Sequence, residues 1–109
     1  MFTLDDLDDD ALDHLPFGVV QLDPRGRVVR YNQPEAARSG IQRWRALGRD
    51  YFQDVAGTSK ELAQRVHELK PGSCETIEHT FRGFHRADHA VVDVSRSDDG
   101  HVYLKIRAA

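Results

Sequence analysis

The chain has 109 residues, of which 39% are hydrophobic and 30% are charged, and its formal net charge is −3. This length fits one domain with a real hydrophobic core. The negative charge argues against a general nucleic-acid-binding protein, because such proteins usually carry a strong basic excess. The apolar runs are too short to span a bilayer, and the N-terminus lacks the pattern of a secretory signal. The single cysteine, Cys74, cannot form an internal disulfide, so we expect a cytoplasmic domain.

Residues 3–15 are expected to form one or two short helices. Thr3 is a candidate N-cap, Asp10 could restart the helix, and Pro16 ends it, because the residue before proline avoids the helical region. The aspartates of this segment are interpreted as its solvated face. Apolar side chains recur at helical spacing and form one stripe: Leu4, Leu7, Ala11, Leu12 and Leu15.

A hairpin followed by a capped helix is expected next. Strands are predicted over 17–23 and 27–31, joined by a turn whose residues are Asp-Pro-Arg-Gly. Asn32 is expected to cap a helix that ends at Ser39-Gly40. Glu35 lies three residues after Asn32, which is the spacing of a capping box.

The remainder of the chain is expected to be helical first and then β-stranded. Helical segments are predicted over 41–47, 50–55 and 60–69, and alternating strands over 75–81, 87–95 and 101–107. The element order is therefore two strands, several short helices and three strands. An α+β fold buries this pattern economically: a five-stranded antiparallel sheet with short helices on one face and an N-terminal helical cap.

That order is the order of the PAS fold, and the residues resemble photoactive yellow protein in particular. The specific parts are Tyr31-Asn32 followed by Glu35, and the stretch GRDYFQDVAG. LDDDALDHLPFGVVQLD, EHTF and VYLKIR also fit, and the resemblance runs from about residue 7 to the end. It implies an N-terminal cap over residues 1–16 and a PAS core over residues 17–109.

The resemblance also implies a pigment site. In that family a p-coumaroyl thioester is attached to a cysteine, and its phenolate is held by a tyrosine and a protonated glutamate. Tyr31 and Glu35 keep these two positions, and Ser39 stands where a threonine supports the tyrosine. Ile41 stands at the position of an arginine that covers the pocket, and Thr58 replaces the cysteine. Covalent attachment is therefore not expected, because a threonine hydroxyl is a poor nucleophile without an activating base.

We expect a non-enzymatic sensor domain that binds a small apolar or aromatic ligand without a covalent bond. Tyr31, Glu35 and Ser39 would supply the polar end of its site. Occupancy would shift residues 3–15 between docked and released states. The other expected lining residues are Ile41, Phe52, Val55, Thr58, Phe81 and Phe84.

Several other interpretations stay open. The chain could be a ligand-free interaction or dimerisation module, with a core plugged by Trp44, Phe52 and Phe81, or a photoreceptor that holds a pigment non-covalently. Glu35 could serve only as part of the helix cap. His67, near the end of the longest helix, could ligate haem. A β-turn centred on Phe84 would make two histidines cross-strand neighbours, which is a weak metal site: His79 and His89.

Overall fold

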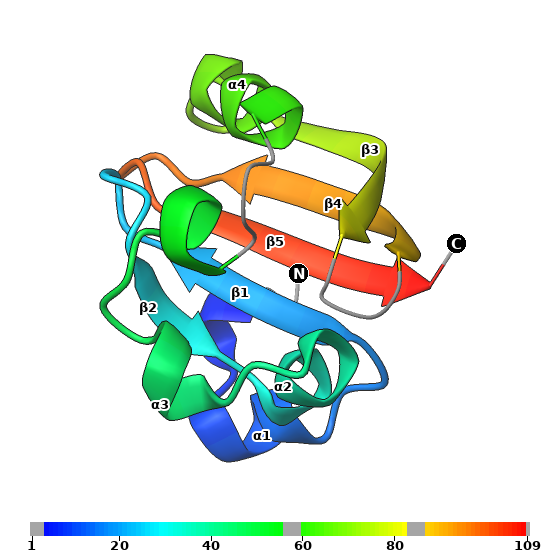
Figure 1. Ribbon diagram of the computed structural model, residues 1–109. Coiled ribbons are helices and arrows are strands. Elements are labelled where there is room, and N and C mark those ends of the chain that lie inside the picture. The colour runs from blue at the N-terminus through cyan, green and yellow to red at the C-terminus, as the bar shows by residue number, and fades with distance from the viewer. Residues whose placement is uncertain (1–3, 56–59, 83–86, 109) are drawn as a thin grey trace.

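One antiparallel sheet organises the computed structural model, which describes residues 4–55, 60–82 and 87–108 (Figure 1). Its five strands lie in the order β2-β1-β5-β4-β3, which confirms the predicted sheet. The last strand of the chain, β5, therefore lies between β1 and β4. The strands are β1 (Gly18–Leu22), β2 (Val28–Tyr31), β3 (Cys74–Arg82), β4 (Ala87–Arg96) and β5 (Val102–Ala108).

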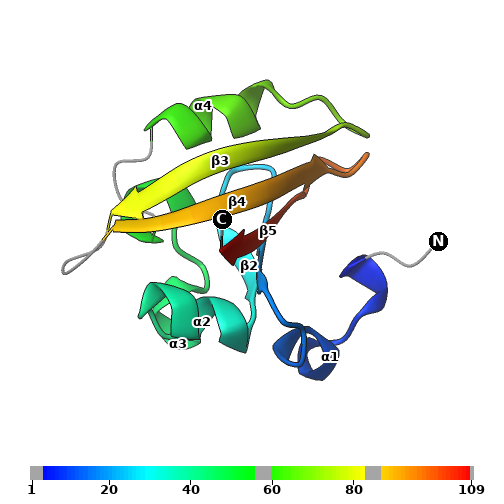
Figure 2. The same ribbon diagram turned by 90° about the vertical axis from the view of Figure 1, so that its right-hand side faces the viewer.

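Helices cover both faces of this sheet. The N-terminal turn η1 (Leu4–Asp6) and helix α1 (Asp9–Asp13) lie across the sheet from α2 and α3, as Figure 2 shows. The face opposite η1 and α1 carries α2 (Gln33–Ser39), α3 (Arg43–Ala46), the π-helical turn η2 (Tyr51–Val55) and α4 (Lys60–Glu68). In the part of the chain that is described, no helix is long and apolar enough to cross a membrane.

Strand alternation divides the buried side chains into two clusters. Val102, Leu104 and Ile106 of β5 enter the main cluster on the α2 side of the sheet, which confirms the alternation predicted for this strand. Tyr103, between them, points the other way and packs with Val19 of β1 and the apolar stripe of the N-terminal helices. A period of two residues thus supplies both faces of the sheet with a core.

The N-terminal helix begins at a different residue from the one expected. Asp8 is its N-cap: the backbone of Asp8 is extended, and its carboxylate accepts a 2.8 Å hydrogen bond from the Ala11 N–H. Asp10 lies inside the helix rather than before it, and Thr3 lies outside the described residues. Helix α1 ends at Asp13, shortly before Pro16.

Two glycine turns were predicted correctly, but one hairpin register was not. Gly26, with φ of 87°, closes the turn between β1 and β2, and Gly40, with φ of 77°, ends α2. In the β3–β4 ladder, His89 pairs with Thr80, and His79 pairs with Ala90. The two histidines are therefore not direct cross-strand partners, and the turn residues 83–86 lie outside the described residues.

Arg96, at the end of β4, fixes α4 over the sheet. Its guanidinium donates to the carbonyl oxygens of Leu69 (2.7 Å) and Val66 (2.9 Å) at the C-terminal end of α4. A third hydrogen bond reaches the Gly100 carbonyl in the β4–β5 turn at 2.8 Å. The Val66 carbonyl also accepts from the Leu69 N–H at 3.1 Å, so the arginine adds a second donor at this helix end, where a cation complements the helix dipole.

We expect Arg96→Ala to lower the free energy of unfolding by about 2 kcal/mol, because it removes charge-assisted hydrogen bonds to three carbonyls. Urea unfolding measures the change. Amide hydrogen exchange should accelerate first in α4. Arg107→Ala, on the exposed end of β5, is the matched control and should change little. An Arg96→Ala protein with the wild-type unfolding midpoint would contradict the assignment.

Candidate functional site

Asn32 positions the candidate site by joining α2 to β1. Its side-chain oxygen accepts hydrogen bonds from the Glu35 N–H (3.2 Å) and the Val19 N–H (2.8 Å), which confirms Asn32 as the cap. The reciprocal half of the predicted capping box is wrong. The Asn32 N–H donates to the Val19 carbonyl at 3.1 Å, because strand pairing continues to that residue. The Glu35 carboxylate is therefore available to another partner.

That partner is Arg38, one turn further along α2. Glu35 is 1% exposed, and both of its carboxylate oxygens accept from the Arg38 guanidinium, at 2.8 Å from Nε and 2.6 Å from a terminal nitrogen. The guanidinium carbon lies 4.6 Å from the centre of the Phe81 ring. A bidentate ion pair beside a helix N-terminus favours the ionised carboxylate. The resemblance implies a neutral glutamic acid at this position.

Gly18 makes room for this carboxylate on β1. A Cβ atom added at Gly18 would lie 2.2 Å from Oε1 of Glu35 and 3.1 Å from its Cβ. No side chain larger than hydrogen fits there while Glu35 stays in place. The glycine is therefore a packing requirement of the site and not a turn residue.

Tyr31, at the end of β2, forms a second hydrogen-bonded group. Its hydroxyl shares a 2.7 Å hydrogen bond with the Ser39 hydroxyl and donates to the Ile41 carbonyl at 3.3 Å. The Ile41 N–H in turn donates to the Ser39 hydroxyl at 3.1 Å. Burial raises the pKa of Tyr31 to about 12, against the lowering effect of the Ser39 hydrogen bond. The phenol is therefore neutral and fixed at physiological pH.

The apolar residues expected in the site belong to the main core. Phe81 is buried beneath Arg38, whereas Ile41, Phe52 and Val55 are partly buried against the core. The Phe52 ring meets the Tyr51 ring edge-on, with 5.2 Å between the centroids. Two further expected lining residues lie outside the described residues: Thr58 and Phe84.

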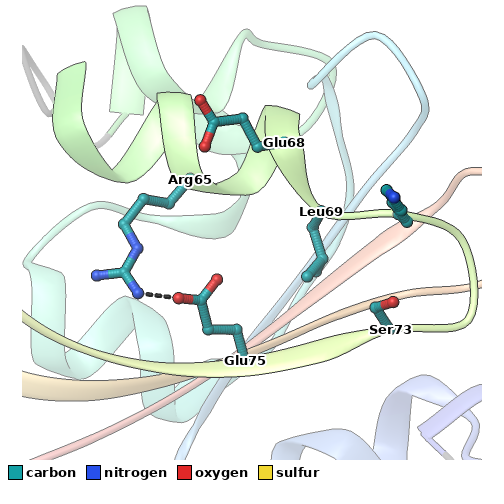
Figure 3. A pocket seen from close by; sticks show the side chains of 6 residues that line it. Arg65, Glu68, Leu69, Ser73 and Glu75 are labelled. Carbon is teal, nitrogen blue, oxygen red and sulfur yellow. Dashed lines mark hydrogen bonds and ion pairs between the residues drawn. The ribbon is translucent and has the colours of Figure 1, made fainter.

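Two cavities lie away from the Glu35–Arg38 ion pair, and only the smaller one includes Tyr31 and Asn32 in its lining. One of about 330 Å³ lies between α4 and the start of β3, where an Arg65–Glu75 ion pair crosses it (Figure 3). The other, of about 50 Å³, lies between α1, β2 and α3. Neither is lined by Glu35, Arg38 or Phe81. The larger cavity was not anticipated from the sequence.

The residues considered for cofactor attachment lie apart from this site. Cys74 is exposed at the start of β3, seven positions before Phe81, which corresponds to about 23 Å along a strand. Its thiol therefore does not fit a covalent pigment beside Tyr31 and Glu35. His67 is exposed on α4. Over residues 4–55, 60–82 and 87–108, no group of three metal-ligating side chains comes together.

Sequence reasoning did not single out three residues of this site, which are Arg38, Tyr51 and Gly18. The spacing of Glu35 and Arg38, three residues apart on one helix, is a known ion-pair signal and could have found Arg38. Tyr51 follows Asp50, whose carboxylate accepts from the Phe52 and Gln53 N–H groups and fixes the turn. Burial, followed by the nearby Glu35 carboxylate, raises the pKa of Tyr51 well above the ordinary phenol value. The role of Gly18 depends on a tertiary contact and leaves no local signal.

Tyr31 makes stability depend on pH at the alkaline end. The unfolded chain releases this proton near pH 10, and the folded chain near pH 12, so the free energy of unfolding should fall as pH rises from 10 to 12. Tyr31→Phe should remove this contribution and the matching tyrosinate absorbance. A Tyr31 absorbance change near pH 10 in the folded protein would show that the phenol is hydrated.

Gly18→Ala should destabilise the protein by about 1–3 kcal/mol, because the added methyl group displaces the Glu35 carboxylate. The cost should be smaller in a Glu35→Ala background, where that oxygen is absent. A thermodynamic cycle of the two changes, measured by urea unfolding, tests this coupling. Additive effects would mean that Gly18 and Glu35 do not compete for space.

Comparisons with known proteins identify the fold. No protein-family model matches the chain. It is 36% identical over 58 residues to photoactive yellow protein of Halochromatium salexigens, and 40% identical over 53 residues to that of Rhodobacter capsulatus. These stretches cover 53% and 49% of this chain, but only 46% and 41% of the relatives. The chain is thus matched to less than half the length of these two relatives.

Solved structures match over nearly the whole chain. The photoactive yellow protein domain of the sensor histidine kinase Ppr from Rhodospirillum centenum has a TM-score of 0.78 and 20% identity, and 96% of each chain is covered. The PAS domain of Bordetella pertussis BvgS has a TM-score of 0.71 and 15% identity, covering 93% of this chain and 82% of that one. The chain therefore has the PAS fold, and over about half of its length its sequence resembles photoactive yellow protein.

Proposed function

We propose that this chain is a non-enzymatic PAS sensor domain. It binds a small aromatic ligand non-covalently beside Tyr31, Glu35 and Ser39, and it transmits occupancy to the N-terminal helices η1 and α1. One observation carries the proposal: the short β2–α2 segment holds both the polar side chains of the candidate site and the groups that anchor the N-terminal helices.

The contacts to the N-terminal helices come from Arg30, Asn32 and Gln33. Arg30 donates to the Leu7 carbonyl at 2.6 Å, and Asn32 to the Leu12 carbonyl at 2.8 Å. The Gln33 N–H donates to an Asp13 carboxylate oxygen at 2.8 Å. Tyr31 and Glu35 lie between or beside these residues on the same short segment, so a shift of α2 alters both sets of contacts. A ligand that favours one position of α2 therefore changes the population of docked helices.

The chemistry of the site favours a planar molecule with a phenol or carboxylate oxygen. Such an oxygen would accept from the Tyr31 hydroxyl and from the Arg38 guanidinium once Arg38 separates from Glu35. The ring would pack against Phe81 and Ile41. Because Arg38 is the cation of the site, an anionic oxygen is favoured over a neutral one.

Native mass spectrometry and an absorption spectrum of the purified protein test for a bound molecule directly. Calorimetry then uses p-coumarate and 4-hydroxybenzoate as probes. We expect Arg38→Met to weaken probe binding by about tenfold or more, which corresponds to the loss of about 1.4 kcal/mol. Arg107→Met, an arginine outside the site, should bind as the wild type does.

Hydrogen exchange tests the signalling half of the proposal. Probe binding should change the exchange rates of residues 4–13, because their anchoring residues share the segment that carries Tyr31. Binding with no change at residues 4–13 would leave the ligand site standing but contradict transmission to the N-terminal helices. An empty purified protein that takes up neither probe would contradict the ligand site itself.

A second candidate is a ligand-free interaction module. The observation that favours it is that Glu35 and Arg38 satisfy each other and Arg38 packs on Phe81, which closes the polar cluster without a ligand. A colourless protein without bound small molecules, together with unchanged stability on probe addition, supports this candidate over the first.

A further inference from the structure

An apolar patch lies on the outer side of α3 and β2. Among the described residues, the exposed large hydrophobic side chains are Trp44 (76% exposed), Val29 (43%) and Leu47 (42%). Val29 and Leu47 line the same small hollow, and Trp44 lies three residues before Leu47, on the same side of a helical turn. The three side chains thus form one patch. Clustered exposed apolar residues usually mark an interaction site, and scattered ones do not.

One end of this patch is basic. Arg25, Arg27 and Arg49 are exposed there, and we call them the basic rim. Hydrogen bonds place them close together: the Val28 N–H donates to the Arg49 carbonyl at 2.9 Å, the Arg27 guanidinium contacts the Gly48 carbonyl at 3.5 Å, and the Arg25 and Arg27 N–H groups share the Asp23 carboxylate. Within the described part of the chain, none of these three guanidinium groups has an acidic ion-pair partner; the nearby carboxylates of Asp23 and Asp50 accept backbone N–H groups.

The other end of the patch is acidic. The carboxylates of Asp8, Asp9 and Asp10 on α1 are exposed, and we call them the acidic rim. An Arg43–Asp13 ion pair joins α3 to α1, and Asp9 lines the same hollow as Val29 and Leu47. Strand β2 connects the two rims: Arg27 directly precedes the strand, and Arg30, near its other end, forms an ion pair with Asp9 at 3.2 Å. The surface therefore runs from basic through apolar to acidic.

We propose that this surface binds a second copy of the chain across a two-fold axis through the apolar patch. A two-fold rotation about Trp44 places the basic rim of each copy opposite the acidic rim of the other, so both electrostatic contacts are attractive. A self-complementary patch of this kind closes as a dimer and does not extend into a filament. A central tryptophan surrounded by charged side chains is also the usual arrangement of an interface hot spot.

The dimer should respond to concentration, salt and Trp44. Sedimentation at rising concentration should move from the 12.4 kDa monomer toward twice that mass, and added salt should reverse the shift because the rims are exposed. Trp44 is the only tryptophan, so its fluorescence should shift to the blue as the dimer forms. Trp44→Ala should abolish association without unfolding the protein, because the Trp44 side chain is exposed.

Charge reversal tests the predicted pairing of the rims. Arg25→Glu with Arg49→Glu, and separately Asp9→Arg with Asp10→Arg, reverse the sign of the basic and the acidic rim and should each weaken self-association by at least tenfold. Mixing the two variants should restore a mixed dimer, because each reversed rim then faces its complement. As a control, Lys60→Glu with Lys70→Glu makes the same net charge change as the double arginine variant, but outside the rims, and should associate as the wild type does.

Two outcomes would overturn the proposal. One is a protein that remains monomeric at every concentration with a water-exposed Trp44 emission spectrum. The other is a dimer that forms normally in Trp44→Ala and in both charge-reversed variants, because it would then use a different surface. Recovery of association in the mixed sample alone supports the two-fold pairing directly.

Discussion

The hydrogen bonds of one buried amide, that of Asn32, hold the parts of this domain in register. Its oxygen accepts from β1 and from the first turn of α2, and its nitrogen donates to the Leu12 and Phe17 carbonyls of the N-terminal segment. A fully satisfied buried polar group stabilises one arrangement, because each alternative leaves a donor or acceptor unpaired. The N-terminal helices, the sheet and α2 therefore share a single anchoring point, and a displacement of one is felt by the others.

Much of the fold could be predicted because its signals are local. Strand alternation and the turn glycines identified all five strands, and the Asn32 cap and Gly40 gave both ends of α2. The start of α1 could not be predicted in the same way. Three consecutive aspartates, Asp8 to Asp10, are equally good caps on local grounds, and the packing of Leu12 against Val19 and Tyr103 decides among them. The β3–β4 register likewise depended on a turn that no strong dipeptide specifies.

The polar residues of the candidate site were found by resemblance, and their partners were not. Tyr31, Ser39 and Glu35 follow from the family pattern. The ion pair and the position of the Glu35 carboxylate, however, depend on Arg38 and Gly18. A glutamate and an arginine three residues apart indicate only a surface ion pair, which contributes little. In this protein the Glu35 carboxylate is buried against the sheet, and this burial requires Gly18 on β1. Site chemistry of this kind cannot be obtained from one helix.

The central position of β5 has a consequence for how the chain folds. β1 pairs with β2, its neighbour in sequence, and with β5, which lies at the opposite end of the chain. During synthesis one edge of the first hairpin therefore stays unpaired until β5 has left the ribosome. Such distant pairing slows folding and leaves a strand edge open to wrong partners in the meantime. The N-terminal helices pack on Tyr103 of β5 as well as on Val19 of β1, so their apolar stripe also gains its full contact surface only when the last strand is in place.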